Sequence, residues 1–148
     1  MRIIRSILHA APWAAIIVAV GCEVLVDPGY WLTVTRVQVH NSSEDASPKM
    51  IVAREVHRPF HGHWTATVKA VDGTIACVAN GDSDYKPETK LPVQIDLDWW
   101  TFPTKCALPP GDYTVFTSWR WRVVWMERET SILSNIFTIT AKGAEAGK

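Results

Sequence analysis

From residue 30 onward, apolar and polar residues alternate with a period of two over most of the chain. The segment HWTATVKAV at residues 63–71 is the clearest example: the even-numbered residues from Trp64 to Ala70 are apolar, and the odd-numbered residues between them are Thr or Lys. A β-strand with one face in a core and the other in water has this pattern, because successive side chains point to opposite faces. The pattern therefore predicts that this part of the chain is all-β.

Turn signals divide the alternating sequence into about seven strands. The dipeptide Asp72-Gly73 stands between two alternating segments and predicts a hairpin. Residues 80–93, NGDSDYKPETKLPV, are polar and are expected to form a connection long enough to cross from one sheet to another. A chain of 148 residues has room for one core. We therefore expect a β-sandwich domain over residues 30–141 and a flexible tail over residues 142–148.

The first 26 residues have the composition of a signal peptide or a membrane anchor. Arg2 and Arg5 precede an apolar stretch that ends in AVGC at residues 19–22. AVGC resembles the cleavage box of bacterial lipoproteins, which implies cleavage before Cys22 and attachment of a lipid to its thiol. The same stretch, extended to Val26, has about the 20 residues that a membrane helix needs. An uncleaved anchor and a soluble secreted domain therefore stay open as alternatives.

The location of the domain follows from this segment. With basic residues before the apolar stretch, the positive-inside rule places the rest of the chain outside the cytoplasm, in the periplasm or the extracellular space. If Cys22 carries a lipid, Cys77 and Cys106 remain as an even pair in an oxidising compartment. We expect these two cysteines to form a disulfide, with two buried free thiols as the alternative.

Charge and motif patterns exclude several function classes. The chain has 15 basic and 15 acidic residues and no basic cluster, so a nucleic-acid partner is not expected. The segment HRPFHGHW offers His57, His61 and His63 as the candidates for a metal site, but no carboxylate or thiol stands near them in the sequence. Asp82 and Asp84 have a calcium-like spacing without the rest of the calcium-loop pattern. We therefore predict no metal, no cofactor and no enzyme activity.

Tryptophan is unusually frequent, with eight copies. Exposed indoles on a β-sheet face can stack on sugar rings or anchor a protein interface, whereas buried ones fill the core. Trp119 and Trp121 lie in the alternating segment after Gly111, and Trp125 shares their parity. The candidates for ligand binding are Trp99, Trp100, Trp119, Trp121 and Trp125.

The segment LPPGDYTV at residues 108–115 resembles the loop-to-strand entry of immunoglobulin-like and fibronectin type III-like sandwiches. This resemblance implies an immunoglobulin-like β-sandwich in which Tyr113 hydrogen-bonds back to the backbone. Cys106 lies in the loop before the Tyr113 strand, so its bridge to Cys77 would staple the predicted hairpin to that loop and would differ from the disulfide of antibody domains.

Three further segments, HRPFHGHW, DWWTFPTKC and SNIFTI, are similar to small membrane-anchored envelope proteins of alphaproteobacteria and their phages and prophages. That similarity implies a host context only, and no activity. We therefore expect a membrane-anchored interaction module that binds an unidentified protein through exposed strands and loops such as residues 80–92. The alternative is a domain that binds cell-wall glycans through exposed Trp side chains.

Overall fold

The computed structural model describes residues 16–18, 21, 27–88, 95–96, 106–123 and 125–142. Residues 16–18 and 21 are helical, and a 3₁₀ helix, η1 (Pro28–Tyr30), precedes the first strand. The rest of the described chain is mostly β, which confirms the all-β prediction. The strands are β1 (Leu32–Val39), β2 (Ser42–Ser43), β3 (Lys49–Val56), β4 (Phe60–Ala70), β5 (Ile75–Tyr85), β6 (Ile95–Asp96), β7 (Gly111–Val123), β8 (Met126–Leu133) and β9 (Phe137–Thr140).

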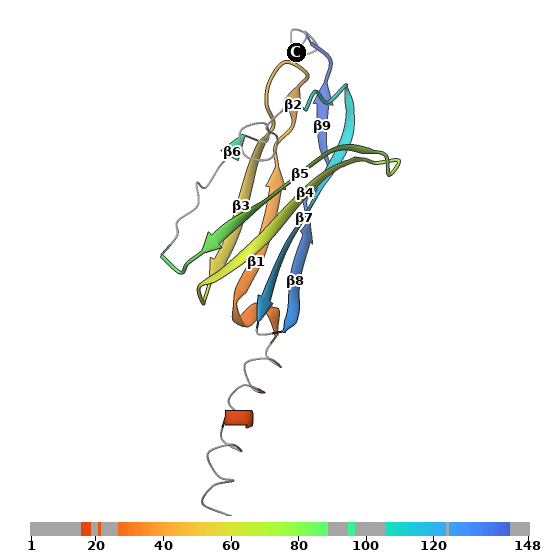
Figure 1. Cartoon of the computed structure of the whole chain (residues 1–148). Helices are drawn as coiled ribbons and strands as arrows, with labels where there is room; N and C mark the ends of the chain where they lie inside the picture. The colour runs from red at the N-terminus through yellow and green to blue at the C-terminus, as the bar shows by residue number, and fades with distance from the viewer. Residues whose placement is uncertain are drawn as a thin grey trace, which may run out of the picture.

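The strands form two sheets (Figure 1). The smaller sheet has the order β1-β3-β6. The larger sheet has the order β2-β9-β7-β4-β5, and β8 also pairs with β7. The long pairs β1–β3, β4–β5, β4–β7 and β7–β8 are all antiparallel, and the short β2 and β9 run parallel. Figure 1 shows the β4–β5 hairpin lying across β1 and β3.

Both sheets contribute to one apolar core. The largest fully buried side chain is Trp119 on β7, which is 0 % exposed, and Met50 on β3 is buried as completely in the opposite sheet. Alternation produces this core, because every second residue of each long strand faces the other sheet. The other buried apolar residues of the strands include Leu32, Val37, Val39, Val52, Ala66, Val68, Val115, Trp121, Phe137 and Ile139.

The hairpin predicted at Asp72-Gly73 is confirmed. Gly73 has a φ of +92°, which glycine adopts without steric cost, and the Asp72 carboxylate accepts a hydrogen bond of 2.8 Å from the amide of Thr74. The second strand is longer than predicted, however. Residues 80–85 were expected in a connection, but β5 continues to Tyr85, so that part of the prediction is wrong. These residues pair with β4 from Phe60 to Thr65, and the side chains of Asp82 and Asp84 hydrogen-bond to histidines of β4.

A second difference concerns strand β8, which is not among the strands predicted from the sequence. Its sequence, MERETSIL, alternates partly buried with exposed residues and pairs with β7 from Phe116 to Val123. Between residues 89 and 105, the structure describes only β6, which pairs with β3. The tail expected over residues 142–148 lies outside the described residues except for Lys142.

Strand β7 runs the length of the larger sheet and defines its two ends. At one end, the amide of Val71 in the β4–β5 turn donates a hydrogen bond to the carbonyl of Asp112 (3.1 Å). At the other end, β7 turns into β8, against which η1 packs. We call these the hairpin end and the η1 end. The 13 residues of β7 place them about 40 Å apart, given about 3.3 Å per residue.

Candidate functional site

The outer face of the larger sheet, on the four strands β5, β4, β7 and β8, presents two kinds of surface. We name the part nearer the η1 end the charged ladder and the part nearer the hairpin end the apolar patch. The charged ladder consists of His61, His63, Asp82, Asp84, Arg120, Glu127 and Glu129. The apolar patch consists of Ile75, Val78, Phe116 and Leu133.

Two histidine–aspartate pairs form one side of the charged ladder. The carboxylate of Asp84 accepts a hydrogen bond of 2.8 Å from Nδ1 of His61, and Asp82 does the same for Nδ1 of His63 at 3.0 Å. The β4–β5 register places each His directly opposite its Asp. Directly opposite residues on one sheet face have their Cβ atoms close enough for side chains to pair. The pairs therefore follow from the hairpin register.

Arg120 forms the other side of the charged ladder. Its Nε lies 3.3 Å from an oxygen of Glu127, and its Nη2 lies 3.4 Å from an oxygen of Glu129. The guanidinium thus sits between two carboxylates of β8. The ionic side chains of the ladder are between 43 % and 75 % exposed. At such exposure each pair contributes little to stability, because water screens the charges.

The apolar patch lies in adjacent rows across the same strands. Val78, Phe116 and Leu133 share one row, with Thr67 of β4 between Val78 and Phe116. Ile75, Val78 and Leu133 are each more than half exposed. The ammonium of Lys69 lies 5.8 Å from the centre of the Phe116 ring and makes a cation–π contact with it. A surface of this kind is typical of protein-binding sites.

A bulge in β5 brings Ile75 into the patch. Val68 pairs with Cys77, but the next residue of β4, Lys69, pairs with Ile75, so that Ala76 is the extra residue. Without the bulge, Ile75 and Cys77 would face the same side of the sheet. With it, Cys77 faces the core and Ile75 faces outward.

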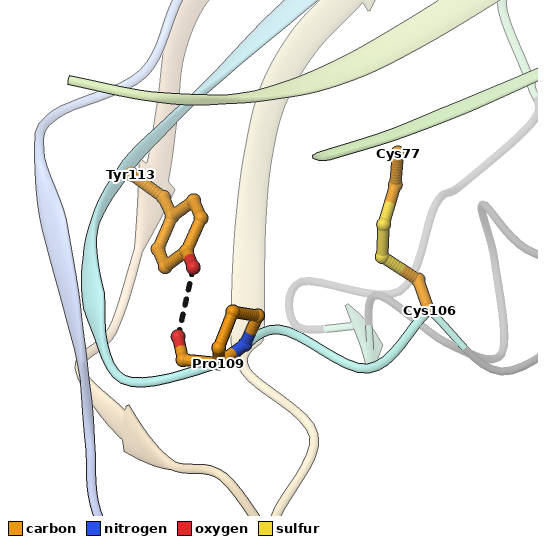
Figure 2. The surroundings of a disulfide bond; sticks show 4 residues. All are labelled: Cys77, Cys106, Pro109 and Tyr113. Atoms are coloured by element: carbon orange, nitrogen blue, oxygen red, sulfur yellow. Dashed lines mark hydrogen bonds between the residues drawn. A yellow bond between two sulfur atoms is a disulfide. The ribbon is translucent and has the colours of Figure 1, made fainter. Parts of the chain in front are cut away.

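The disulfide predicted between Cys77 and Cys106 is present (Figure 2). Cys77 precedes the patch residue Val78 and faces the core side of the sheet, so the bridge lies beneath the apolar patch. The two α-carbons are 6.2 Å apart, within the range that a disulfide spans. As predicted, the bridge ties the β4–β5 hairpin to the segment before β7. In the same segment the hydroxyl of Tyr113 donates a hydrogen bond of 2.8 Å to the carbonyl of Pro109, which confirms the prediction that this side chain bonds back to the backbone.

Aromatic rings support the charged ladder from the core side. The ring of Phe60 stacks on that of Tyr85 at 4.7 Å between centres and lies 4.8 Å from that of Trp121. The guanidinium of Arg54, from the opposite sheet, lies 4.7 Å from the centre of the Tyr85 ring. Burial raises the pKa of the Tyr85 phenol, and burial lowers the pKa of Arg54. The tyrosine is therefore a neutral member of this cluster.

The tryptophan candidates separate into three groups. Trp119 and Trp121 are 0 % and 3 % exposed, so the prediction that they bind a ligand is wrong: both rings fill the core under the charged ladder. Trp125 is 71 % exposed because it stands in the β7–β8 turn, where strand parity no longer applies. Trp99 and Trp100 lie outside the described residues.

The histidine candidates do not form one cluster. His57 contacts the Thr33 hydroxyl (2.9 Å) and the Glu55 carboxylate (3.8 Å), whereas His61 and His63 pair with aspartates of β5. Among the described residues, no group of three His, Cys, Asp or Glu side chains could hold a metal ion. Asp82 and Asp84 were not predicted as partners of the histidines, because the sequence around them is typical of a loop. Extending the hairpin register from Asp72-Gly73 by period two would have found them.

The lipidation candidate Cys22 lies outside the described residues. No helix within the part of the chain that the structure describes is long and apolar enough to span a membrane. No protein-family model matches the chain, and no curated protein matches it in sequence.

Proposed function

We propose that this chain is a membrane-anchored β-sandwich of the immunoglobulin-like class, held outside the cytoplasm, which binds a protein partner on the apolar patch. One observation carries the proposal: Val78 and Leu133, together with Ile75 in the neighbouring row, expose more than half of their side chains on one sheet face. Exposed apolar area of this kind is costly in water unless a partner covers it.

The location outside the cytoplasm rests on the cysteines and the N-terminal segment. Disulfides persist in oxidising compartments and are rare in the bacterial cytosol. The Cys77–Cys106 bridge therefore agrees with export, which the basic and apolar residues before position 27 would direct. Anchoring occurs either through a lipid on Cys22 or through the retained apolar stretch.

The immunoglobulin-like class is supported by two features. Two sheets face each other across one core, and the antiparallel β4–β7 pair lies at the centre of the larger sheet. The Tyr113 hydroxyl bonds to a carbonyl four residues upstream, at the start of β7, as the tyrosine corner of such domains does.

A protein partner fits the outer face better than a glycan does. Sugar binding uses flat, exposed aromatic rings. Within the described residues, Phe116 is the one aromatic member of the patch and is only partly exposed, and the other patch residues are aliphatic. Trp119 and Trp121 are buried, and the exposed Trp125 stands apart from this face in the β7–β8 turn. Nor does the charged ladder suggest catalysis. His61 and His63 pair with carboxylates, but no described hydroxyl or thiol bonds to their other ring nitrogens.

A photo-crosslinking experiment tests the binding site. A benzophenone amino acid replaces Leu133 in the full chain, expressed in the membrane of its natural host, and it replaces Glu129 as the matched control. Both residues lie on the outer face of β8, in the patch and in the ladder respectively. We expect a defined protein crosslink from position 133, weakened by Val78→Asp. Equal crosslinking from both positions, or none from position 133, would contradict the proposal.

Export and anchoring are tested separately. The chain is fused at its C-terminus to alkaline phosphatase, which is active only after export, and to β-galactosidase, which is active only in the cytoplasm. We expect phosphatase activity in the membrane fraction and no β-galactosidase activity. The intact mass of the membrane-bound protein then distinguishes a lipid on Cys22 from a retained N-terminal segment.

A further inference from the structure

The η1 end of the domain carries an exposed indole beside the point where the N-terminal segment joins. Trp125, in the β7–β8 turn, is 71 % exposed, and η1 packs against β8. Figure 1 shows that β1 begins at the same end of the molecule where β7 ends and β8 begins. Because η1 begins at Pro28, any anchor in residues 1–26 is attached to this end.

The tether between anchor and domain is short, given the anchoring that we propose above. Cys22 lies five positions before Asp27, which caps η1 through a hydrogen bond from the amide of Gly29 (2.8 Å). Five fully extended residues span at most about 18 Å. A retained apolar stretch ending at Val26 leaves no linker at all. In either case the η1 end is held within about 18 Å of the membrane, less than the length of the domain.

The chemistry of this end suits the membrane–water interface. Tryptophan and tyrosine concentrate at the level of the lipid headgroups, because each has an apolar ring and a polar tip. Tyr30 in η1 is partly exposed. The guanidinium of Arg58 lies 4.1 Å from the centre of the Tyr30 ring and donates a hydrogen bond to the Tyr30 hydroxyl. Aromatic rings and a cation thus lie close to the attachment point.

We propose that the η1 end rests on the lipid bilayer and that Trp125 inserts its indole at the headgroup level. The interaction partner of this surface is the membrane to which the chain is tethered. It follows that the hairpin end, about 40 Å away along β7, points away from the membrane. The apolar patch then faces the space in which a protein partner can reach it.

Fluorescence quenching by brominated lipids tests this contact on the full chain. The chain with Trp13→Phe, which silences the indole in the N-terminal segment, is reconstituted into phosphatidylcholine–phosphatidylglycerol vesicles. The same measurement is made with Trp125→Phe added. We expect lipids brominated near the headgroup end of the acyl chain to quench the first protein, and Trp125→Phe to remove most of that quenching. Thermal unfolding checks that both variants fold alike, since Trp125 is exposed.

A relocated indole is the matched control. Val71 is 62 % exposed in the β4–β5 turn at the hairpin end, so Val71→Trp, added to the doubly substituted chain, should restore fluorescence without restoring quenching. Vesicle flotation separates the possible failures. If the chain floats with the vesicles and Trp125→Phe leaves the quenching unchanged, the inference is wrong while anchoring stands. If the chain does not float, anchoring itself is wrong, and the inference fails with it.

Discussion

The charged ladder and the apolar patch are built on the same four strands and face the same side, yet they differ in how their side chains are satisfied. In the ladder, His61 and His63 pair with aspartates and Arg120 pairs with two glutamates. In the patch, Val78 and Leu133 remain more than half exposed. Strand alternation specifies which residues face outward, but it does not specify whether the outward-facing side chains find partners within the same molecule.

The two parts also differ in what lies beneath them. Large rings, including Trp119 and Trp121, fill the core under the ladder. Smaller side chains such as Val68 and Val115, together with the disulfide, lie under the patch. The packing of large rings thus supports the ladder, whereas a covalent bridge supports part of the patch. The following predictions test this division, in the order of the expected effect.

Removing the large ring under the ladder should have the largest effect. Trp119→Ala leaves a cavity at a site that is 0 % exposed, and we expect it to lower the free energy of unfolding by about 3–5 kcal/mol. Denaturant titration measures the loss. Trp125→Ala is the control, because the same change at an exposed turn should alter stability by less than about 0.5 kcal/mol. Similar losses at both positions would contradict the assignment of Trp119 to the core.

Removing the bridge under the patch comes second. The double variant Cys77→Ala/Cys106→Ala opens a loop of 29 residues, and we expect a loss of about 3–4 kcal/mol from the chain-entropy relation. Wild-type protein under reducing conditions should lose a similar amount. Hydrogen exchange should show faster exchange in β5 near Val78 than in the ladder rows. A uniform increase over both parts would show that the bridge does not support the patch in particular.

Much of this architecture is predictable from the sequence, because its signals are local. Asp72-Gly73 specifies the hairpin, the alternation from Trp64 to Ala70 specifies the buried face of β4, and the even pair of cysteines specifies the bridge. In each case a few neighbouring residues determine the geometry. The position of Tyr113 after a Pro-Pro-Gly turn is local in the same sense.

The candidate site was harder to predict, because its signals are not local. Asp82 and Asp84 are typical of a loop when read along the chain, and they become strand residues through their partners on β4. Ile75 reaches the outer face only through the bulge at Ala76, which no composition signal indicates. Strand β8 is polar along most of its length, so that its pairing with β7 depends on the neighbouring strand. Cross-strand register, rather than residue type, assembles the outer face.

The hydrogen bond at the start of β7 should have a smaller effect than the bridge. Tyr113→Phe removes the donor to Pro109 and leaves the ring packed against Phe137 at 5.9 Å between centres. We expect a loss of about 1 kcal/mol, because a part-buried carbonyl is left without its partner. Thermal unfolding with and without reductant measures it. If the loss disappears once the bridge is reduced, Tyr113 and the bridge act on the same segment; if it persists, they act independently.

The ionic pairs of the ladder should have the smallest effect of all. Arg120 and Glu129 are 52 % and 44 % exposed, so a double-mutant cycle with Arg120→Gln and Glu129→Gln should give a coupling energy of less than about 1 kcal/mol. High salt should reduce it further, because exposed charges are screened. Leu133→Thr, in the patch on the same strand, is the control. The change that it causes in the free energy of unfolding should not depend on salt. A coupling of several kcal/mol that survives high salt would mean that the ladder holds the sheet together. The two parts of the outer face would then differ in structural role as well as in whether they need a partner.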